Sequence, residues 1–281
     1  MALTFEPLNH DEPAVRAKIF AFVAPQEPYG LFLLGNLNAQ VPGTHFYGLR
    51  EGAAWRVIGA HYEGPRSIVP FALPGTEPAL LGEFGREISS RHPDFDWLLG
   101  MDSTARPMLD VLVSRGYAVL NDPVQVFMEM RGLPAVQPHE EFAKLARPGD
   151  LEATVRLLRY LRGQTDDGSP ITAGERAQFE INKDRMVLER EGRVVSTAAS
   201  NGVGIAACQV LGVATAPEER GKGYAGATVA ALMRHMAKQG AKHTILFTRH
   251  DNRPAIRCYE KLGYKITGDY LLAKLKGPAG R

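Results

Sequence analysis

VATAPEERGKGYAGA, residues 213–227, is the stretch of this 281-residue chain that decides its fold. It joins an apolar run at 206–215, typical of a central strand, to a segment whose apolar side chains recur with helical spacing. The first turn of a helix has unpaired N–H groups that attract anions, and glycines at 221 and 223 remove the Cβ atoms that would hold a phosphate away. The stretch therefore predicts a phosphate site, although a plain glycine turn would give the same pattern.

Two motifs in the second half of the chain resemble the GNAT superfamily of N-acetyltransferases. The segment Pro217-x-x-Arg220-Gly221-Lys222-Gly223-Tyr224-Ala225 is similar to the superfamily's acetyl-CoA pyrophosphate loop. The segment Asn252-x-x-Ala255-x-x-x-Tyr259-Glu260-Lys261-Leu262-Gly263-Tyr264 is similar to its second signature. The resemblance covers about residues 140–276 and implies an N-acetyltransferase that takes acetyl-CoA as its co-substrate.

The resemblance implies a role for each matched position. Tyr259 corresponds to the general acid, and a phenol of pKa about 10 can protonate a departing thiolate of pKa about 8.5 or higher. Apart from the match, Tyr259 reads as a core aromatic residue on an apolar helix stripe. The residues expected to bind acetyl-CoA are Val213, Ala214, Thr215, Arg220, Gly221, Lys222, Gly223, Tyr224, Ala225, Gly226 and Asn252.

One departure from the family pattern concerns the general base. Many members carry a glutamate five residues before the asparagine, and this chain has Phe247 there. The base is therefore unassigned, and a water chain or one of four side chains could serve: Glu180, Glu189, His250 or Asp251. Cys208 and Cys258 have no neighbours in sequence that would lower a thiol pKa, so we interpret them as buried thiols and not as nucleophiles or metal ligands.

The two halves of the chain contain a repeat at an offset of 147 residues. Five identities fall within seventeen positions: Arg106-Pro107 with Arg253-Pro254, Gly116-Tyr117 with Gly263-Tyr264, and Asp122 with Asp269. In each half a strand (97–101, 244–248) precedes a helix that we expect proline to initiate, and a Gly-Tyr pair leads into a last strand. The repeat indicates two copies of one unit.

The repeat and the resemblance together predict an α/β (α+β) fold with two GNAT-like units, each a mixed, mostly antiparallel sheet flanked by helices. We expect a degenerate first unit at 1–131, a Pro- and Gly-containing linker at 132–139 and an acetyl-CoA-binding domain at 140–281. The first unit is called degenerate because, at the offset of 147, it replaces Arg220, Gly221, Gly223, Asn252 and Tyr259 by Leu73, Pro74, Thr76, Ala105 and Leu112.

Sequence patterns also predict the elements of the second half. We expect strands at 142–147, 186–191, 193–200, 206–215 and 270–276. Helices are expected at 150–161, with Asp150 as its N-cap, near 173–182, and at 225–239, which Gly240 terminates. The loop at 163–175 carries Asp166 and Asp167, which could attract a cationic amine or simply hydrate a turn.

Composition limits the partners. Thirty-three Lys and Arg against 31 Asp and Glu give a net charge of +2, too small to gather nucleic acid or anionic lipid, and no apolar run approaches the roughly 20 residues of a membrane span. We therefore expect a cytoplasmic protein with no nucleic-acid, membrane or metal partner and a small-molecule or peptide amine as acceptor. Formation of a homo-oligomer is left open.

Two other functions compete with acetyl transfer. A regulatory or scaffold protein could retain CoA binding without turnover, as the missing glutamate allows. Gly221-x-Gly223-x-x-Gly226 also matches a dinucleotide-binding fingerprint with Asp251 as a distant ribose ligand. We disfavour that oxidoreductase interpretation because four residues separate the strand from the first glycine and only 55 residues follow Gly226.

Overall fold

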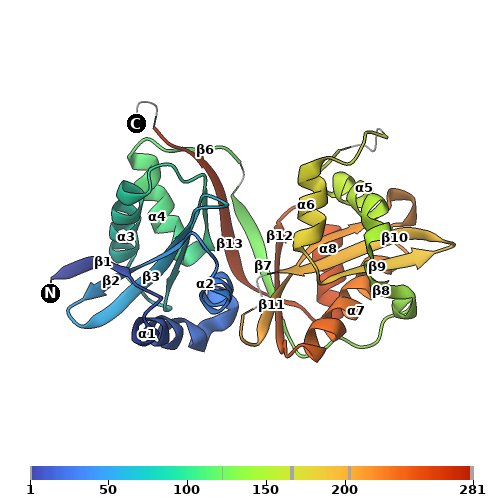
Figure 1. Cartoon of the computed structure of the whole chain (residues 1–281), viewed down its shortest axis with the longest axis horizontal. Helices are drawn as coiled ribbons and strands as arrows, with labels where there is room; N and C mark the ends of the chain where they lie inside the picture. The colour runs from blue at the N-terminus through green and yellow to red at the C-terminus, as the bar shows by residue number, and fades with distance from the viewer. Residues whose placement is uncertain (1, 122, 165–167, 202–203, 279–281) are drawn as a thin grey trace. The chain divides into compact units, whose positions relative to one another are not determined.

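A computed structural model describes residues 2–121, 123–164, 168–201 and 204–278 (Figure 1). Asp122, Asp166 and Asp167 lie outside the described residues. The chain divides into two compact units that interleave in sequence: unit 1 contains the residues up to Phe127, Phe247–Asp251 and the residues from Ile266 onward, and unit 2 contains Met128–Leu246 and Asn252–Lys265. This differs from the sequential division expected from the linker, because the last strand of the chain belongs to unit 1.

The sheet of unit 1 has the strand order β1-β2-β3-β4-β5-β13. Every neighbouring pair is antiparallel except β4 and β5, which are parallel. A two-residue strand, β6, also pairs with β13. The strands are β1 (Leu3–Leu8), β2 (Thr44–Glu51), β3 (Ala54–Tyr62), β4 (Ser67–Ala72), β5 (Trp97–Met101), β6 (Ala118–Val119) and β13 (Lys265–Lys276).

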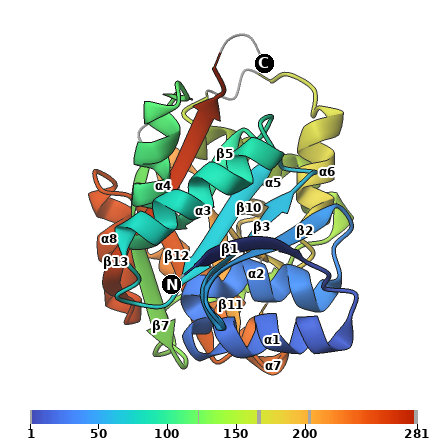
Figure 2. The same ribbon diagram turned by 90° about the vertical axis from the view of Figure 1, so that its left-hand side faces the viewer.

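Helices cover both faces of the unit 1 sheet, as Figures 1 and 2 show, with α1 and α2 on one side and α3 and α4 on the other. Side chains alternate between the two faces of the strands, so the sheet contributes to two separate apolar clusters. One includes Phe46 and Phe71 and lies under α1 and α2, and the other includes Phe84 and Met108 and lies at α3 and α4. The helices are α1 (Pro13–Val23), α2 (Glu27–Ala39), α3 (Pro78–Arg91) and α4 (Asp102–Ser114), with a 3₁₀ turn, η1 (Ala24–Gln26), before α2.

Unit 2 repeats this architecture. Its strands follow the order β12-β11-β10-β9-β8, in which only the β11–β12 pair is parallel. The strands are β8 (Ala143–Leu145), β9 (Arg185–Arg190), β10 (Arg193–Asn201), β11 (Ala207–Thr215) and β12 (His243–Arg249). Both β12 and β7 (Val124–Arg131) cross the boundary between the units. The helices are α5 (Leu151–Leu161), α6 (Ala173–Ile181), α7 (Tyr224–Lys238) and α8 (Arg253–Leu262), with 3₁₀ turns η2 (Glu140–Phe142), η3 (Pro148–Asp150) and η4 (Pro217–Glu219).

The predicted fold class is confirmed, since each unit is a mixed, mostly antiparallel sheet flanked by helices. The helices of unit 2, its hairpin and its central strand also lie where the sequence places them. Among the described residues, no helix is both long enough and apolar enough to cross a membrane.

Three local expectations differ from the structure. The strand expected at 142–147 shortens to β8, because residues 140–142 form a 3₁₀ turn. Proline does not initiate α4: the helix begins at Asp102, whose carboxylate pairs with Arg106 at 2.8 Å, and Pro107 sits inside it, where it removes one helical hydrogen bond. Asp150 occupies the N-cap position of α5, but its side chain accepts from the Arg147 N–H at 2.8 Å instead of capping that helix.

Candidate active site

A β-bulge bends β11 near its carboxyl end. Thr197 of β10 pairs with Ala214 and Ala199 pairs with Leu211, so that two residues of β11, Gly212 and Val213, face a single residue of β10. Gly212 has a φ of +59°, a left-handed conformation that favours glycine. Beyond the bulge β11 continues to pair with β10, through Ala214 and Thr215.

The pairing of β11 with β12 is short. It joins only Ala207–Gln209 to His243–Ile245, at the amino end of a nine-residue strand. Val213, Ala214 and Thr215, which we predict to bind the pantetheine arm of acetyl-CoA, all lie beyond the end of this pairing. Backbone groups that lack a strand partner need another one, so this edge of β11 suits an extended ligand that carries amides.

The glycine turn after β11 leaves its backbone accessible. Gly221 and Gly223 have φ values of +81° and +87°, and a Cβ at either position would meet no atom within 4 Å. Gly223 is the N-cap residue of α7, whose first turn contains no acidic residue and receives no hydrogen bond from a capping side chain. The N–H groups at the start of α7 are therefore open to an anion.

Two exposed cations accompany these N–H groups. Arg220 donates from Nε to the Thr215 carbonyl at 3.4 Å, which turns its side chain back toward the end of β11. The ammonium of Lys222 lies 2.7 Å from the carboxylate of Glu219; this pair raises the pKa of Lys222 and lowers that of Glu219. Arg193 also reaches Glu219, at 3.4 Å, so the carboxylate of Glu219 is compensated and the turn keeps its cationic character.

The remaining residues of the motif face the interior. Tyr224 is buried with Leu188 and Val195, and its ring meets that of His139 edge to face at 5.1 Å. Gly226 is buried too and faces α8, where a Cβ would lie in ordinary contact with Cys258 Sγ, at 3.7 Å. The structure thus places these two residues behind the turn, whereas Arg220–Gly223 form its exposed surface.

Tyr259 lies on the buried face of α8 with Ile256 and Leu262, as the apolar stripe predicts. Its side chain is 7% exposed, its ring meets that of Tyr264 at 5.8 Å, and burial raises the pKa of its hydroxyl above the ordinary value. Among the described residues, the Tyr259 hydroxyl makes no hydrogen bond to another protein group. The hydroxyl therefore stays protonated at neutral pH and is available to a ligand.

Asn252 is the N-cap residue of α8, although its side chain makes no capping hydrogen bond. The carboxylate of the neighbouring Asp251 pairs with Arg249, which lowers the pKa of Asp251. Asn252 begins the helix that carries Tyr259, so the two members of the second signature share one rigid element.

The four side chains considered as the general base are not brought together. His250 Nε2 lies 3.0 Å from Asp269, and Glu189 pairs with Lys144 at 2.5 Å. Asp251 is paired as described, and Glu180 is exposed on α6. None of them is singled out by its surroundings.

The two cysteines show no sign of activation. Cys208 is buried and Cys258 partly buried, and desolvation raises the pKa of both thiols, that of Cys208 to about 11. Among the described residues there is also no group of three or more His, Cys, Asp or Glu side chains able to hold a metal ion.

The bulge in β11 is not among the features predicted from the sequence. Its signal is Gly212 in an otherwise apolar strand, where an isolated glycine often marks a bulge. The Ser196 hydroxyl supports the same segment, donating to the Ala214 carbonyl at 3.1 Å, and no motif identifies it.

Comparison with known proteins agrees with this geometry. The profile of the acetyltransferase (GNAT) family matches residues 156–264, which contain the short parallel pair β11–β12 and the glycine turn at the start of α7. The similarity to the GNAT acetyltransferase family covers residues 156–264, which are less than half of the chain. This result confirms the resemblance seen in the two motifs.

Relatives with curated functions and solved structures extend the comparison. A mycothiol acetyltransferase of Corynebacterium aurimucosum is 36% identical over 62 residues, which are 22% of this chain and 20% of that protein. The chain thus matches only about a fifth of the length of such relatives.

Two solved structures resemble nearly the whole chain. A GCN5-related N-acetyltransferase from Sphaerobacter thermophilus has a TM-score of 0.63 at 15% identity and covers 98% of this chain and 95% of its own. A tandem GNAT protein from the clavulanic acid biosynthesis pathway has a TM-score of 0.57 at 14% identity, over 100% of both chains. At these identities the similarity establishes the tandem GNAT fold.

Proposed function

We propose that unit 2 transfers acetyl from acetyl-CoA to a primary amine of a small molecule or peptide, by direct attack in a ternary complex. The observation that carries the proposal is the turn Arg220–Gly223, where two glycines with positive φ leave open space before an uncapped helix. A diphosphate suits that place because backbone N–H groups, the helix dipole and two cations all favour negative charge there.

The other residues have assigned roles in this proposal. The free edge of β11 at Val213–Thr215 hydrogen-bonds the pantetheine amides and polarises the acetyl carbonyl, which stabilises the developing oxyanion. Asn252 contacts the cofactor. Tyr259 gives its proton to the departing CoA thiolate, which its raised pKa permits only when the thiolate is close and desolvated.

Deprotonation of the amine is the step without an assigned residue. Phe247 stands where the family pattern has a glutamate, and its phenyl ring cannot accept a proton. We assign this proton to water. The identity of the amine stays open. The mycothiol acetyltransferases match this chain over too small a part of their length for their substrate to be assigned to it.

The rival is a regulatory or scaffold protein that binds CoA and does not turn over, and the absent glutamate favours it. An assay of CoA release from acetyl-CoA separates the two, run with a panel of primary amines and without acceptor. Release that requires an amine, with the acetylated amine identified by mass spectrometry, supports the proposal. Tight CoA binding without release for every amine supports the rival.

A further inference from the structure

Unit 1 contains a second opening between parallel strands. β4 and β5 pair only at Ser67–Trp97 and Ile68–Leu98, although both strands continue beyond these residues. The next residues include Pro70, which has no N–H to offer. The pairing of β4 with β3 continues through Pro70, so the strand that lacks a hydrogen bond from the Pro70 nitrogen is β5. Proline thus limits the parallel pairing of unit 1 in the strand pair that corresponds to β11 and β12 of unit 2, which is also short.

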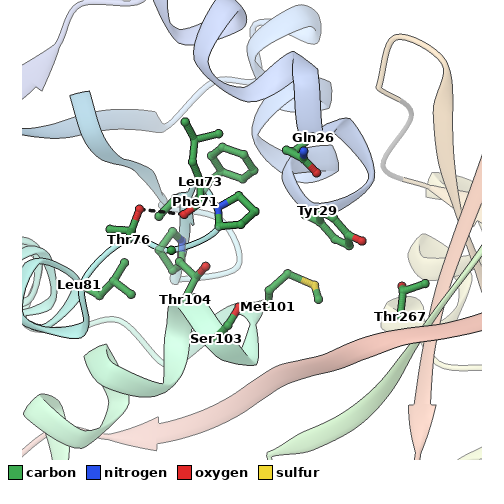
Figure 3. A pocket seen from close by; sticks show the side chains of 14 residues that line it. Gln26, Tyr29, Phe71, Leu73, Thr76, Leu81, Met101, Ser103, Thr104 and Thr267 are labelled. Atoms are coloured by element: carbon green, nitrogen blue, oxygen red, sulfur yellow. Dashed lines mark hydrogen bonds between the residues drawn. The ribbon is translucent and has the colours of Figure 1, made fainter. Parts of the chain in front are cut away.

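A cavity of about 290 Å³ lies at this opening (Figure 3). Gln26 of η1 and Tyr29 of α2 stand on one side of it, and Met101 and Ser103 stand on the other. Its lining offers an amide, several hydroxyl groups and apolar surface, and no Lys, Arg, His, Asp or Glu is among the lining residues. A site of this composition fits an uncharged ligand that has both polar and apolar parts.

The turn beside this cavity does not suit a phosphate. When the two units are aligned on the first residues of α3 and α7, Gly75 corresponds to Gly221 and has the same conformation, with a φ of +83°. The residue that then corresponds to Gly223 is Glu77, the N-cap residue of α3, and it is followed by Pro78, which lacks an N–H. A carboxylate and a proline thus replace the anion-binding backbone.

We propose that the cavity of unit 1 binds an uncharged, chain-like molecule of the pantetheine type, with secondary amides and a hydroxyl, and rejects the nucleotide part of CoA. The choice of this ligand class rests on the proposed function of unit 2, where the matching opening receives the pantetheine arm. The site itself rests on the opening at Pro70, the uncharged lining and the residues before α3.

Pantetheine is the probe, and calorimetry with the full chain is the measurement. The Gly223→Val protein serves as the background, because it disables the phosphate turn of unit 2. We expect this protein to bind pantetheine at the cavity and CoA only weakly at unit 2, so that Ser103→Phe leaves the affinity for CoA unchanged. Ser103→Phe, which fills the cavity from an exposed position, should then weaken pantetheine binding by about tenfold or more.

Ser114→Phe, at an exposed position of the same helix outside the cavity, is the matched control and should leave pantetheine affinity unchanged. Absence of pantetheine binding to the Gly223→Val protein, or an equal effect of both phenylalanines, overturns the site. If CoA binds the cavity of unit 1 as tightly as pantetheine does, the proposal that this cavity rejects the nucleotide part of CoA is wrong. These results do not depend on acetyl transfer, so failure of the proposed function would be recognised separately by the CoA-release assay.

Discussion

The ring of Phe247 lies parallel to that of Tyr270, with 4.6 Å between the centroids and 2° between the planes. Tyr270 is buried and also stacks on Phe127 at 5.9 Å, and desolvation raises the pKa of its hydroxyl. Position 247 therefore belongs to an aromatic stack, in which a carboxylate would lose the ring contact with Tyr270. The stack explains how the chain accommodates the loss of the glutamate without offering a substitute base.

The first prediction concerns the pH dependence of turnover. An alkyl ammonium has a pKa near about 10.4, so under about one per cent is nucleophilic at neutral pH. With water as the base, kcat/KM should rise with pH along the ionisation of the amine itself. For two acceptor amines of different pKa, the acid limb of the pH profile of kcat/KM should therefore shift with the pKa of the amine.

A dedicated base would behave differently. An acid limb that stays near neutrality for both amines, and that disappears in a variant with alanine at Glu180, Glu189 or His250, would show that one of these side chains accepts the proton. Moving limbs would instead fit a role for Phe247 as an apolar wall beside the acceptor nitrogen.

The second prediction tests the phosphate turn. Gly223→Val should weaken CoA binding by about tenfold or more, since a lost charge-assisted hydrogen bond is worth roughly 1.5 to 3 kcal/mol and valine tolerates a positive φ poorly. Gly192→Val is the matched control, because Gly192 also has a positive φ and open space but lies in the β9–β10 hairpin. Calorimetry should give one CoA site per wild-type chain. Two equivalent sites, or equal losses in both variants, would contradict the assignment.

The third prediction concerns the general acid. Tyr259→Phe should lower kcat by about 10² to 10⁴ under conditions in which chemistry limits the rate, with little change in CoA affinity. Tyr264→Phe serves as the comparison, because Tyr264 is the buried neighbour whose hydroxyl accepts from Thr244 at 2.8 Å. It should lower stability more than kcat. Full activity of Tyr259→Phe would remove this tyrosine from the mechanism.

The fourth prediction concerns the stability of unit 1 in acid. The His61 ring stacks on that of His92 at 3.9 Å and lies near His45, Glu63 and Arg66. Burial, then the neighbouring His92 and His45, lower the pKa of His61 from 6.5 to about 4, and Glu63 opposes this shift. Below pH 6.5 His61 becomes protonated in the unfolded chain but stays neutral in the folded chain. The free energy of unfolding should therefore fall as the pH drops toward about 4.

Urea unfolding between pH 7.5 and pH 4.5 measures this dependence. His61→Phe keeps a ring for stacking and cannot be protonated, so it should flatten the decline. His10→Phe, outside the cluster, should leave the decline as in the wild type. Equal pH dependence of the wild type and His61→Phe would exclude His61 as its source.

Local sequence determined most of unit 2. The strand, the glycine turn and α7 follow from apolar periodicity and from two glycines that need a positive φ, and Gly240 ends the helix where predicted. These features depend on residues close together in the chain. The motif alone also located Arg220, Gly221 and Gly223 at one exposed turn.

Only the tertiary structure decided where β13 pairs and what Pro70 and Gly226 do. The sequence predicts a strand at 270–276 in the second unit. In the structure β13 is longer, and pairing such as Tyr270 with Met101, between residues far apart in sequence, places it in unit 1 from Ile266 onward. Pro70 opens a strand pair only because β5 is its neighbour, and Gly226 packs against α8 only because that helix crosses nearby. Periodicity reports which side chains share a face, whereas the partner of that face is fixed by packing over the whole unit.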